Sequence, residues 1–111
     1  MRMRRKKNLV PRMEACGQWL IRDPKAQRGH WRELMPGAKE LRLELGCGKG
    51  RFTCQTAAAD PDVLFIAVER VPDAMVMAME KARSLELTNV FSVDADAAEL
   101  PEFFAPDEVD L

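Results

Sequence analysis

The chain has 111 residues, of which 47% are hydrophobic and 32% are charged, and its formal net charge is −1. This length allows a single small domain, and this composition is typical of a soluble globular protein and excludes a low-complexity chain. No apolar run reaches the roughly 18 residues of a membrane span, and no apolar segment follows the basic start "MRMRRKK", so we expect a cytoplasmic protein without a secretory signal.

Basic residues are concentrated near the N-terminus. Residues 1–33 contain ten Lys or Arg and three Asp or Glu, a balance of +7, whereas residues 34–111 have a balance of −8. Such a split is typical of a basic arm that meets nucleic acid or a membrane, but on charge alone we favour a solvated tail. The candidate phosphate contacts of such an arm are Arg2, Arg4, Arg5, Lys6 and Lys7.

Residues 1–40 are predicted to form a basic arm followed by a short helical lead-in. Residues 15–40 mix apolar side chains, Trp19 and Trp31 among them, with several Pro and Gly residues. Because Pro and Gly interrupt regular structure, we expect short helical or irregular pieces that pack on a core.

The cysteine and histidine residues suggest no catalytic or metal site. The three cysteines, Cys16, Cys47 and Cys54, are odd in number and form no CxxC pair. We therefore expect free and mostly buried thiols, without a disulfide or a bound metal. The only histidine, His30, is interpreted as a surface or packing residue.

From residue 41 onward, apolar strands alternate with helices. The predicted strands and helices cover, in chain order, residues 41–45, 51–60, 63–69, 71–87 and 89–95. Connections of this length permit only parallel pairing of the strands. The fold class is therefore α/β, a Rossmann-like doubly wound parallel sheet of which residues 41–111 contain only the first β-α-β-α-β half.

Two of these segments have a distinctive pattern. The run "VLFIAVE" (63–69) is apolar up to its last residue, which indicates a strand buried on both faces. In the helix over 71–87, we interpret the methionines 75, 77 and 79 as core or rim filler. One apolar face of that helix is predicted from residues at spacings of three and four: Val71, Ala74, Ala78, Ala82 and Leu85.

The chain ends with "PDEVDL", which looks like a loop that enters an apolar run. We therefore expect the chain to be a fragment. We also expect the third strand to form an exposed edge, because the strand that should cover it would be cut near Val109.

The stretch "LRLELGCGKGRF" (41–52) places Gly46, Gly48 and Gly50 at alternate positions between a strand and a helix, with Glu44 two residues before them. A glycine-rich turn at this place lets a ligand approach the backbone. The dinucleotide pattern GxGxxG would need glycine where Arg51 stands, and the phosphate-binding pattern GxxxxGK[ST] also fails. The stretch therefore predicts a nucleotide-type site with neither of those two motifs.

Acidic residues follow the other two strands. Glu69 ends the second strand, where a carboxylate can accept both ribose hydroxyls of a nucleoside; a solvated charge is the less favoured alternative. Asp96 follows the third strand, where it can accept from an adenine amino group, and Asp94 competes for that role. The ends of parallel strands share one sheet edge, so these acids should lie close together.

The pattern Glu44-x-Gly46-x-Gly48-x-Gly50 resembles motif I of the class I S-adenosylmethionine-dependent methyltransferases. The segments "GHWRELM", "LRLELGCGKGRF", "FIAVER", "LTNV", "DADAAEL" and "DEVDL" together resemble the N-terminal half of the bacterial tRNA (guanine-N7-)-methyltransferases. This resemblance covers essentially the whole chain. It implies S-adenosylmethionine as the cofactor and, as cofactor-binding residues, Glu44, Gly46, Gly48, Gly50, Glu69 and Asp96.

The same resemblance implies a function. Members of that family methylate guanine 46 in the variable loop of tRNA, so tRNA is the expected partner. Guanine N7 carries a lone pair and needs no deprotonation, so catalysis can be mainly positioning, and we expect no catalytic residue within this chain. In the family, an Asp-Pro-Trp-Pro-Lys stretch with the acceptor-side aspartate follows the segment matching "DEVDL", so we expect the 111 residues alone to be inactive.

Two other functions compete with this interpretation. The chain could be a half-domain that binds a nucleoside or RNA and performs no chemistry. An NAD-dependent oxidoreductase is disfavoured, because Arg51 stands where its fingerprint requires glycine. The sequence gives no indication of the oligomeric state.

Overall fold

The computed structural model describes residues 9–46 and 51–110 of the chain. Three parallel strands form one sheet in the order β1-β2-β3: β1 is Glu40–Leu45, β2 is Val63–Glu69 and β3 is Val90–Asp94. Helix α2 (Arg51–Ala59) connects β1 to β2, and α3 (Pro72–Ser84) connects β2 to β3. The predicted α/β class and the β-α-β-α-β order are confirmed.

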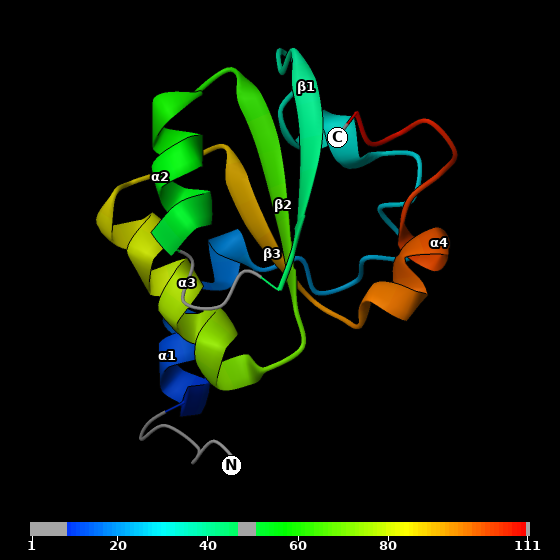
Figure 1. The fold of residues 1–111 in the computed structure, drawn as a ribbon. Helices are drawn as coiled ribbons and strands as arrows, with labels where there is room; N and C mark the ends of the chain where they lie inside the picture. The colour runs from blue at the N-terminus through cyan, green and yellow to red at the C-terminus, as the bar shows by residue number, and fades with distance from the viewer. Residues whose placement is uncertain (1–8, 47–50, 111) are drawn as a thin grey trace.

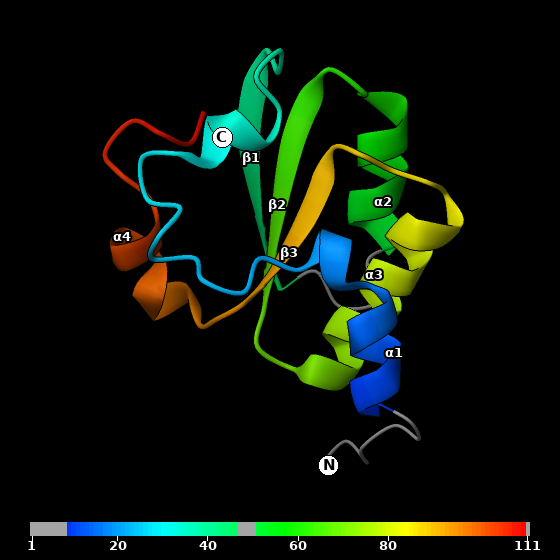
Figure 2. The same cartoon turned by 180° about the vertical axis from the view of Figure 1, so that it is seen from behind.

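The elements form layers on the two faces of the sheet (Figures 1 and 2). One face is covered by α2, α3 and the N-terminal helix α1 (Leu9–Ala15). The other face is covered by the short 3₁₀ helix η2 (Trp31–Leu34) and by α4 (Leu100–Phe103). Two further 3₁₀ helices complete the described elements: η1 (Gly17–Trp19) follows α1, and η3 (Ala97–Glu99) leads directly into α4.

All seven residues of β2 are buried, which explains why its sequence is a continuous apolar run. Alternate side chains enter different cores: Val63 and Phe65 pack with α2 and α3, whereas Leu64, Ile66 and Val68 pack on the opposite face. Because β2 lies between β1 and β3, its last residues adjoin the ends of both strands: Val68 is the register partner of Leu45, and Glu69 that of Asp94.

Helix α3 is shorter than the sequence suggested. It ends at Ser84, and Leu85, which we expected on the apolar face, is 43% exposed. The end is closed by a Schellman motif, in which Glu86 takes a positive φ of 54° while the Leu87 N–H donates to the Ala82 carbonyl. The methionine prediction holds best for Met75 and Met79, which are fully buried in the core.

The lead-in runs past β3 and contributes one tryptophan to each core. Trp19 joins the core on the α3 side, and its indole N–H donates to the Leu87 carbonyl at 2.8 Å. The chain then pairs with β3 through the Ile21 N–H and the Ser92 carbonyl at 2.9 Å. Trp31 is buried on the opposite face, where its indole N–H donates to the Phe103 carbonyl at 2.7 Å. The short helical pieces are therefore packed on the core, as predicted.

The C-terminal segment lies beside β1, and our expectation that it would cover β3 is wrong. The Asp110 N–H donates to the Leu41 carbonyl at 2.8 Å, and the Leu41 N–H donates to the Asp110 carboxylate at 2.7 Å. The sheet grows from β1 outward to β3, and the chain then returns across the η2 face to β1. This reversal is the switch of direction that defines a doubly wound sheet.

A buried carboxylate holds the lead-in against this returning segment. The Glu108 side chain accepts hydrogen bonds from the backbone N–H groups of Gly29, Trp31 and Ala105 at 2.9, 3.1 and 2.9 Å. Three donors compensate the carboxylate for the water that it loses on burial. Glu108 thereby ties the lead-in to the segment whose next residues reach β1.

Cys16 and Cys54 are free and buried, as predicted, and Cys47 lies outside the described residues. His30 is exposed, which fits the interpretation of a surface residue. None of the helices in residues 9–46 and 51–110 is long and apolar enough to cross a membrane.

Candidate functional site

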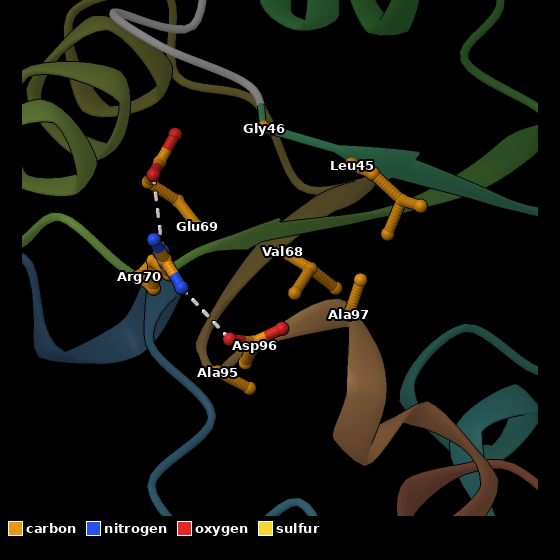
Figure 3. A pocket seen from close by; sticks show the side chains of 8 residues that line it. All are labelled: Leu45, Gly46, Val68, Glu69, Arg70, Ala95, Asp96 and Ala97. Carbon is orange, nitrogen blue, oxygen red and sulfur yellow. Dashed lines mark hydrogen bonds and ion pairs between the residues drawn. The ribbon is translucent and has the colours of Figure 1, made fainter.

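A cavity of about 230 Å³ lies at the carboxyl ends of the three strands (Figure 3). It is the place where doubly wound sheets bind their ligands. Its lining comes from the ends of β1 and β2 and from the loop after β3: Leu45, Gly46, Val68, Glu69, Arg70, Ala95, Asp96 and Ala97.

Glu69 is the last residue of β2, and only 9% of its surface is exposed. Its Oε1 accepts from the backbone N–H groups of Arg70 and Val71 at 3.0 and 3.1 Å. Val71 precedes Pro72, which starts α3, so the carboxylate lies at the N-terminal end of that helix. Backbone donors and the helix dipole both favour a negative charge at this place.

Asp96 begins the 3₁₀ helix η3 and caps it. Its Oδ1 accepts from the Ala98 N–H at 3.1 Å, and its own N–H donates to the Glu99 carboxylate at 3.1 Å, which completes a capping box. The second oxygen, Oδ2, accepts from the Arg70 guanidinium at 2.8 Å. The Ala98 N–H and the Arg70 guanidinium hold the pKa of the Asp96 carboxyl below its ordinary value, so it is ionised at neutral pH.

Asp94, the alternative to Asp96, is placed differently. It is the register partner of Glu69 at the end of β3, and it is not among the residues that line the cavity. Partial burial and the charge of Glu99 raise the pKa of Asp94. The structure therefore brings Asp96 to the cavity together with Glu69 and leaves Asp94 beside it.

Of the residues in the glycine motif, Gly46 lies at the cavity and Glu44 does not line it. Glu44 is half-buried in β1, where it is the register partner of Ala67. Gly46 has a positive φ of 63°, and a Cβ atom built there would meet nothing within 4 Å. Its backbone thus borders open space that a ligand can enter. Gly48 and Gly50 lie outside the described residues, as do the five basic residues Arg2, Arg4, Arg5, Lys6 and Lys7.

Arg70 is the functional candidate that the sequence did not reveal. It follows Glu69 directly, is exposed, and lines the cavity, and Figure 3 shows it between Glu69 and Asp96. The signal was present in the segment "FIAVER", whose last residue is a cation between two predicted binding acids. Its importance appears only when β3 brings Asp96 next to the end of β2.

The composition of the lining suits binding better than bond-making. Leu45, Val68 and Ala95 supply an apolar wall on which a base can pack, and the two carboxylates can accept from hydroxyl and amino groups. The described lining contains no Cys, His, Ser or Lys that could act as a nucleophile or base. Nor do residues 9–46 and 51–110 group three His, Cys, Asp or Glu side chains so that they could hold a metal ion.

Three parallel strands with helices on both faces define the class of Rossmann-like α/β domains. Within that class, the chain belongs to the family described as "Putative methyltransferase", whose model matches residues 38–111. The resemblance seen in the sequence motifs is confirmed by this match and by the relatives.

Two curated relatives carry the same name. The chain is 39% identical over 109 residues to the "tRNA (guanine-N(7)-)-methyltransferase" of Geobacillus thermodenitrificans, a match that covers 98% of this chain and 50% of the relative. It is 40% identical to the protein of the same name from Geobacillus kaustophilus, again over 98% of this chain and 50% of the relative. The chain thus spans about half the length of the curated relatives it matches.

Solved structures support the fold. An "antibiotic related Methyltransferase" superposes with a TM-score of 0.55 at 25% identity, covering 66% of this chain and 39% of that one. The "antibiotic-resistance methyltransferase Kmr" superposes with a TM-score of 0.53 at 25% identity, covering 62% of this chain and 37% of that one.

Proposed function

We propose that the chain forms the S-adenosylmethionine-binding half of a tRNA (guanine-N7-)-methyltransferase. The observation that carries the proposal is the cavity at which Glu69 and Asp96 meet, in a chain whose relatives of that name match it over 98% of its length. The proposed substrate follows from the relatives' name, and the cavity is where we propose that the methyl donor binds.

The described residues fit the nucleoside part of this donor. Glu69 offers a carboxylate for the ribose hydroxyls, Asp96 offers one for the adenine amino group, and Gly46 leaves its side of the cavity open. The cavity of about 230 Å³ is smaller than the roughly 300–1,000 Å³ of pockets for drug-sized ligands, so it suits the nucleoside alone. We propose that Glu44, Gly48 and Gly50 bind the part of the donor outside its nucleoside.

The proposed chemistry needs no general base from the protein's side chains. When bound, S-adenosylmethionine supplies an activated methyl group on a sulfonium sulfur. Guanine N7 is a hydrogen-bond acceptor with a free lone pair, so the substrate needs no general base. The residues of this chain would orient the donor and exclude water, and rate enhancement would come mainly from positioning. The two carboxylates of the described lining, Glu69 and Asp96, are accordingly assigned to binding the donor.

Glu69→Ala should weaken S-adenosylmethionine binding by about 1.5–3 kcal/mol, the range for hydrogen bonds to a charged group. The measurement is calorimetry on the intact protein, meaning the full gene product that carries this chain. Glu86→Ala is the matched control, because Glu86 is exposed and does not line this cavity. A dissociation constant unchanged in the Glu69 variant would contradict the ribose assignment.

The basic arm should act on tRNA and not on the methyl donor. Replacing Arg4, Arg5, Lys6 and Lys7 together by alanine should weaken tRNA binding and flatten its salt dependence, because fewer counterions are released. The measurement is the slope of log affinity against log salt concentration for the intact protein, with the affinity for the methyl donor as the internal control. An unaltered slope would return the arm to the solvated-tail interpretation.

A further inference from the structure

The cavity contains a contact that any nucleoside would have to change. Arg70 lines the cavity between Glu69 and Asp96, and its Nη1 lies 2.8 Å from Asp96 Oδ2 (Figure 3). These two carboxylates are the ones to which the proposed function assigns the ribose and the base. The Arg70 guanidinium donates to Asp96, whereas the Arg70 backbone N–H donates to Glu69 Oε1 at 3.0 Å.

Both oxygens of Asp96 already have a donor. Oδ1 accepts from the Ala98 N–H, and Oδ2 accepts from Arg70. The Ala98 bond is part of the capping box that starts η3, so losing it would disturb the local fold. The bond from Arg70 belongs to a side chain alone and can be exchanged without moving the backbone. Oδ2 is therefore the oxygen that a ligand can take over.

We propose that Arg70 is a positioning residue that latches Asp96 and releases its Oδ2 when the base of a nucleoside enters the cavity. This inference rests on the proposed function, because it concerns the same site. In the latched state, Arg70 holds the Asp96 carboxylate in place. In the bound state, the exocyclic amino group of the base replaces the guanidinium at Oδ2.

The exposure of the pair makes such an exchange feasible. The side chain of Arg70 is 72% exposed and that of Asp96 is 46% exposed, so water screens their attraction. Exposed ion pairs are weak, and their strength falls further as salt is added. The latch therefore lowers the affinity for a nucleoside only slightly, and it does so in a salt-dependent manner.

The latch can be removed without shortening the side chain. Arg70→Met keeps the aliphatic length but removes the cation, and it should tighten binding of S-adenosylhomocysteine about two- to fivefold at low salt. This probe has the nucleoside but lacks the sulfonium charge, so its own electrostatics do not obscure the result. Arg70→Lys should return the affinity toward the wild-type value. Arg22→Met is the matched control, because Arg22 is also exposed but does not line the cavity.

Two readouts separate a latch from a purely structural role. The gain from Arg70→Met should shrink when salt is raised from about 0.05 M to about 0.5 M, because salt already weakens the wild-type pair. The gain should also vanish in an Asp96→Ala background, where the carboxylate that Arg70 is proposed to hold is absent. Both measurements use calorimetry on the intact protein.

The outcomes are distinguishable. If the wild type binds the probe, Glu69→Ala loses affinity and Arg70→Met gains it, the latch and the proposed function are both supported. If Arg70→Met binds the probe equally or more weakly while Glu69→Ala still loses affinity, the latch is overturned and the proposed function stands. If the wild type does not bind the probe, the proposed function fails and the latch fails with it.

Discussion

Replacing Trp31 by alanine is expected to lower the free energy of unfolding by about 3–5 kcal/mol, the range for large aromatic residues removed from a core. Trp31 is completely buried, and its ring stacks on that of Phe104 with centroids 4.7 Å apart. Its indole N–H donates to the Phe103 carbonyl at 2.7 Å, so the change also leaves a buried acceptor without its donor. The loss compares with a total stability of about 5–15 kcal/mol for a typical domain.

Urea denaturation of the intact protein, followed by far-UV circular dichroism, measures this loss. Trp31→Phe keeps an aromatic ring while removing the indole donor, so it should cost less than the alanine change. Val10→Ala is the surface control, because Val10 is 56% exposed and should have little effect. A loss below about 1 kcal/mol for Trp31→Ala would mean that η2 is not a structural part of the sheet's second face.

The 111-residue chain alone is expected to transfer no detectable methyl group to tRNA. It spans about half the length of the relatives named as tRNA methyltransferases. In the described residues the cavity has little wall on the β1 side, where Leu45 lines it and is still 52% exposed. The described residues therefore offer a guanine little surface on that side to hold it against a bound donor.

The measurement is N7-methylguanosine in tRNA, quantified by mass spectrometry after incubation with S-adenosylmethionine. The Geobacillus thermodenitrificans relative provides the positive control, and the same tRNA without protein provides the baseline. Methylation above that baseline by the 111-residue chain would show that all the groups needed for transfer lie within it. Binding of the donor without transfer would support a division between a donor half and an acceptor half.

The central part of the fold was predictable because its signals are local. The apolar run of β2 is typical of a strand buried on both faces, and the structure confirms that interpretation. The end of α3 was missed because Glu86 adopts a left-handed conformation that is usual for glycine, and no sequence signal marked it. Leu85 was consequently assigned to a face that the helix does not extend far enough to form.

The sequence pattern did not predict the side-chain contacts between segments that are far apart in the chain. Asn89, which was predicted only as the first residue of a strand, is buried, and its Nδ2 donates to the carbonyls of Ala57, Asp60 and Val63. Glu108 was predicted only to lie in a loop, yet its buried side chain accepts from three backbone N–H groups. Such roles depend on which backbone groups the fold leaves unpaired, and this is known only once the segments are brought together.

In the site, too, the residue with a local sequence signal was predicted and the one that depends on a distant partner was not. Glu69 was recognisable because a charge at the end of an otherwise apolar strand needs a reason. Arg70 was not, because charged residues after strands are common and its partner Asp96 lies 26 positions away. The choice of Asp96 over Asp94 for the cavity agrees with the structure, while the binding roles of both Glu69 and Asp96 remain predictions.

The placement of the two tryptophans gives the molecule a pair of built-in optical reporters. Trp19 is buried among the helices of one layer and Trp31 among the short elements of the other, and the chain has no further tryptophan. In the variants Trp19→Phe and Trp31→Phe, the remaining indole emission would follow one layer at a time. Coincident emission changes in the two variants during unfolding would show that the two layers unfold together in one cooperative transition.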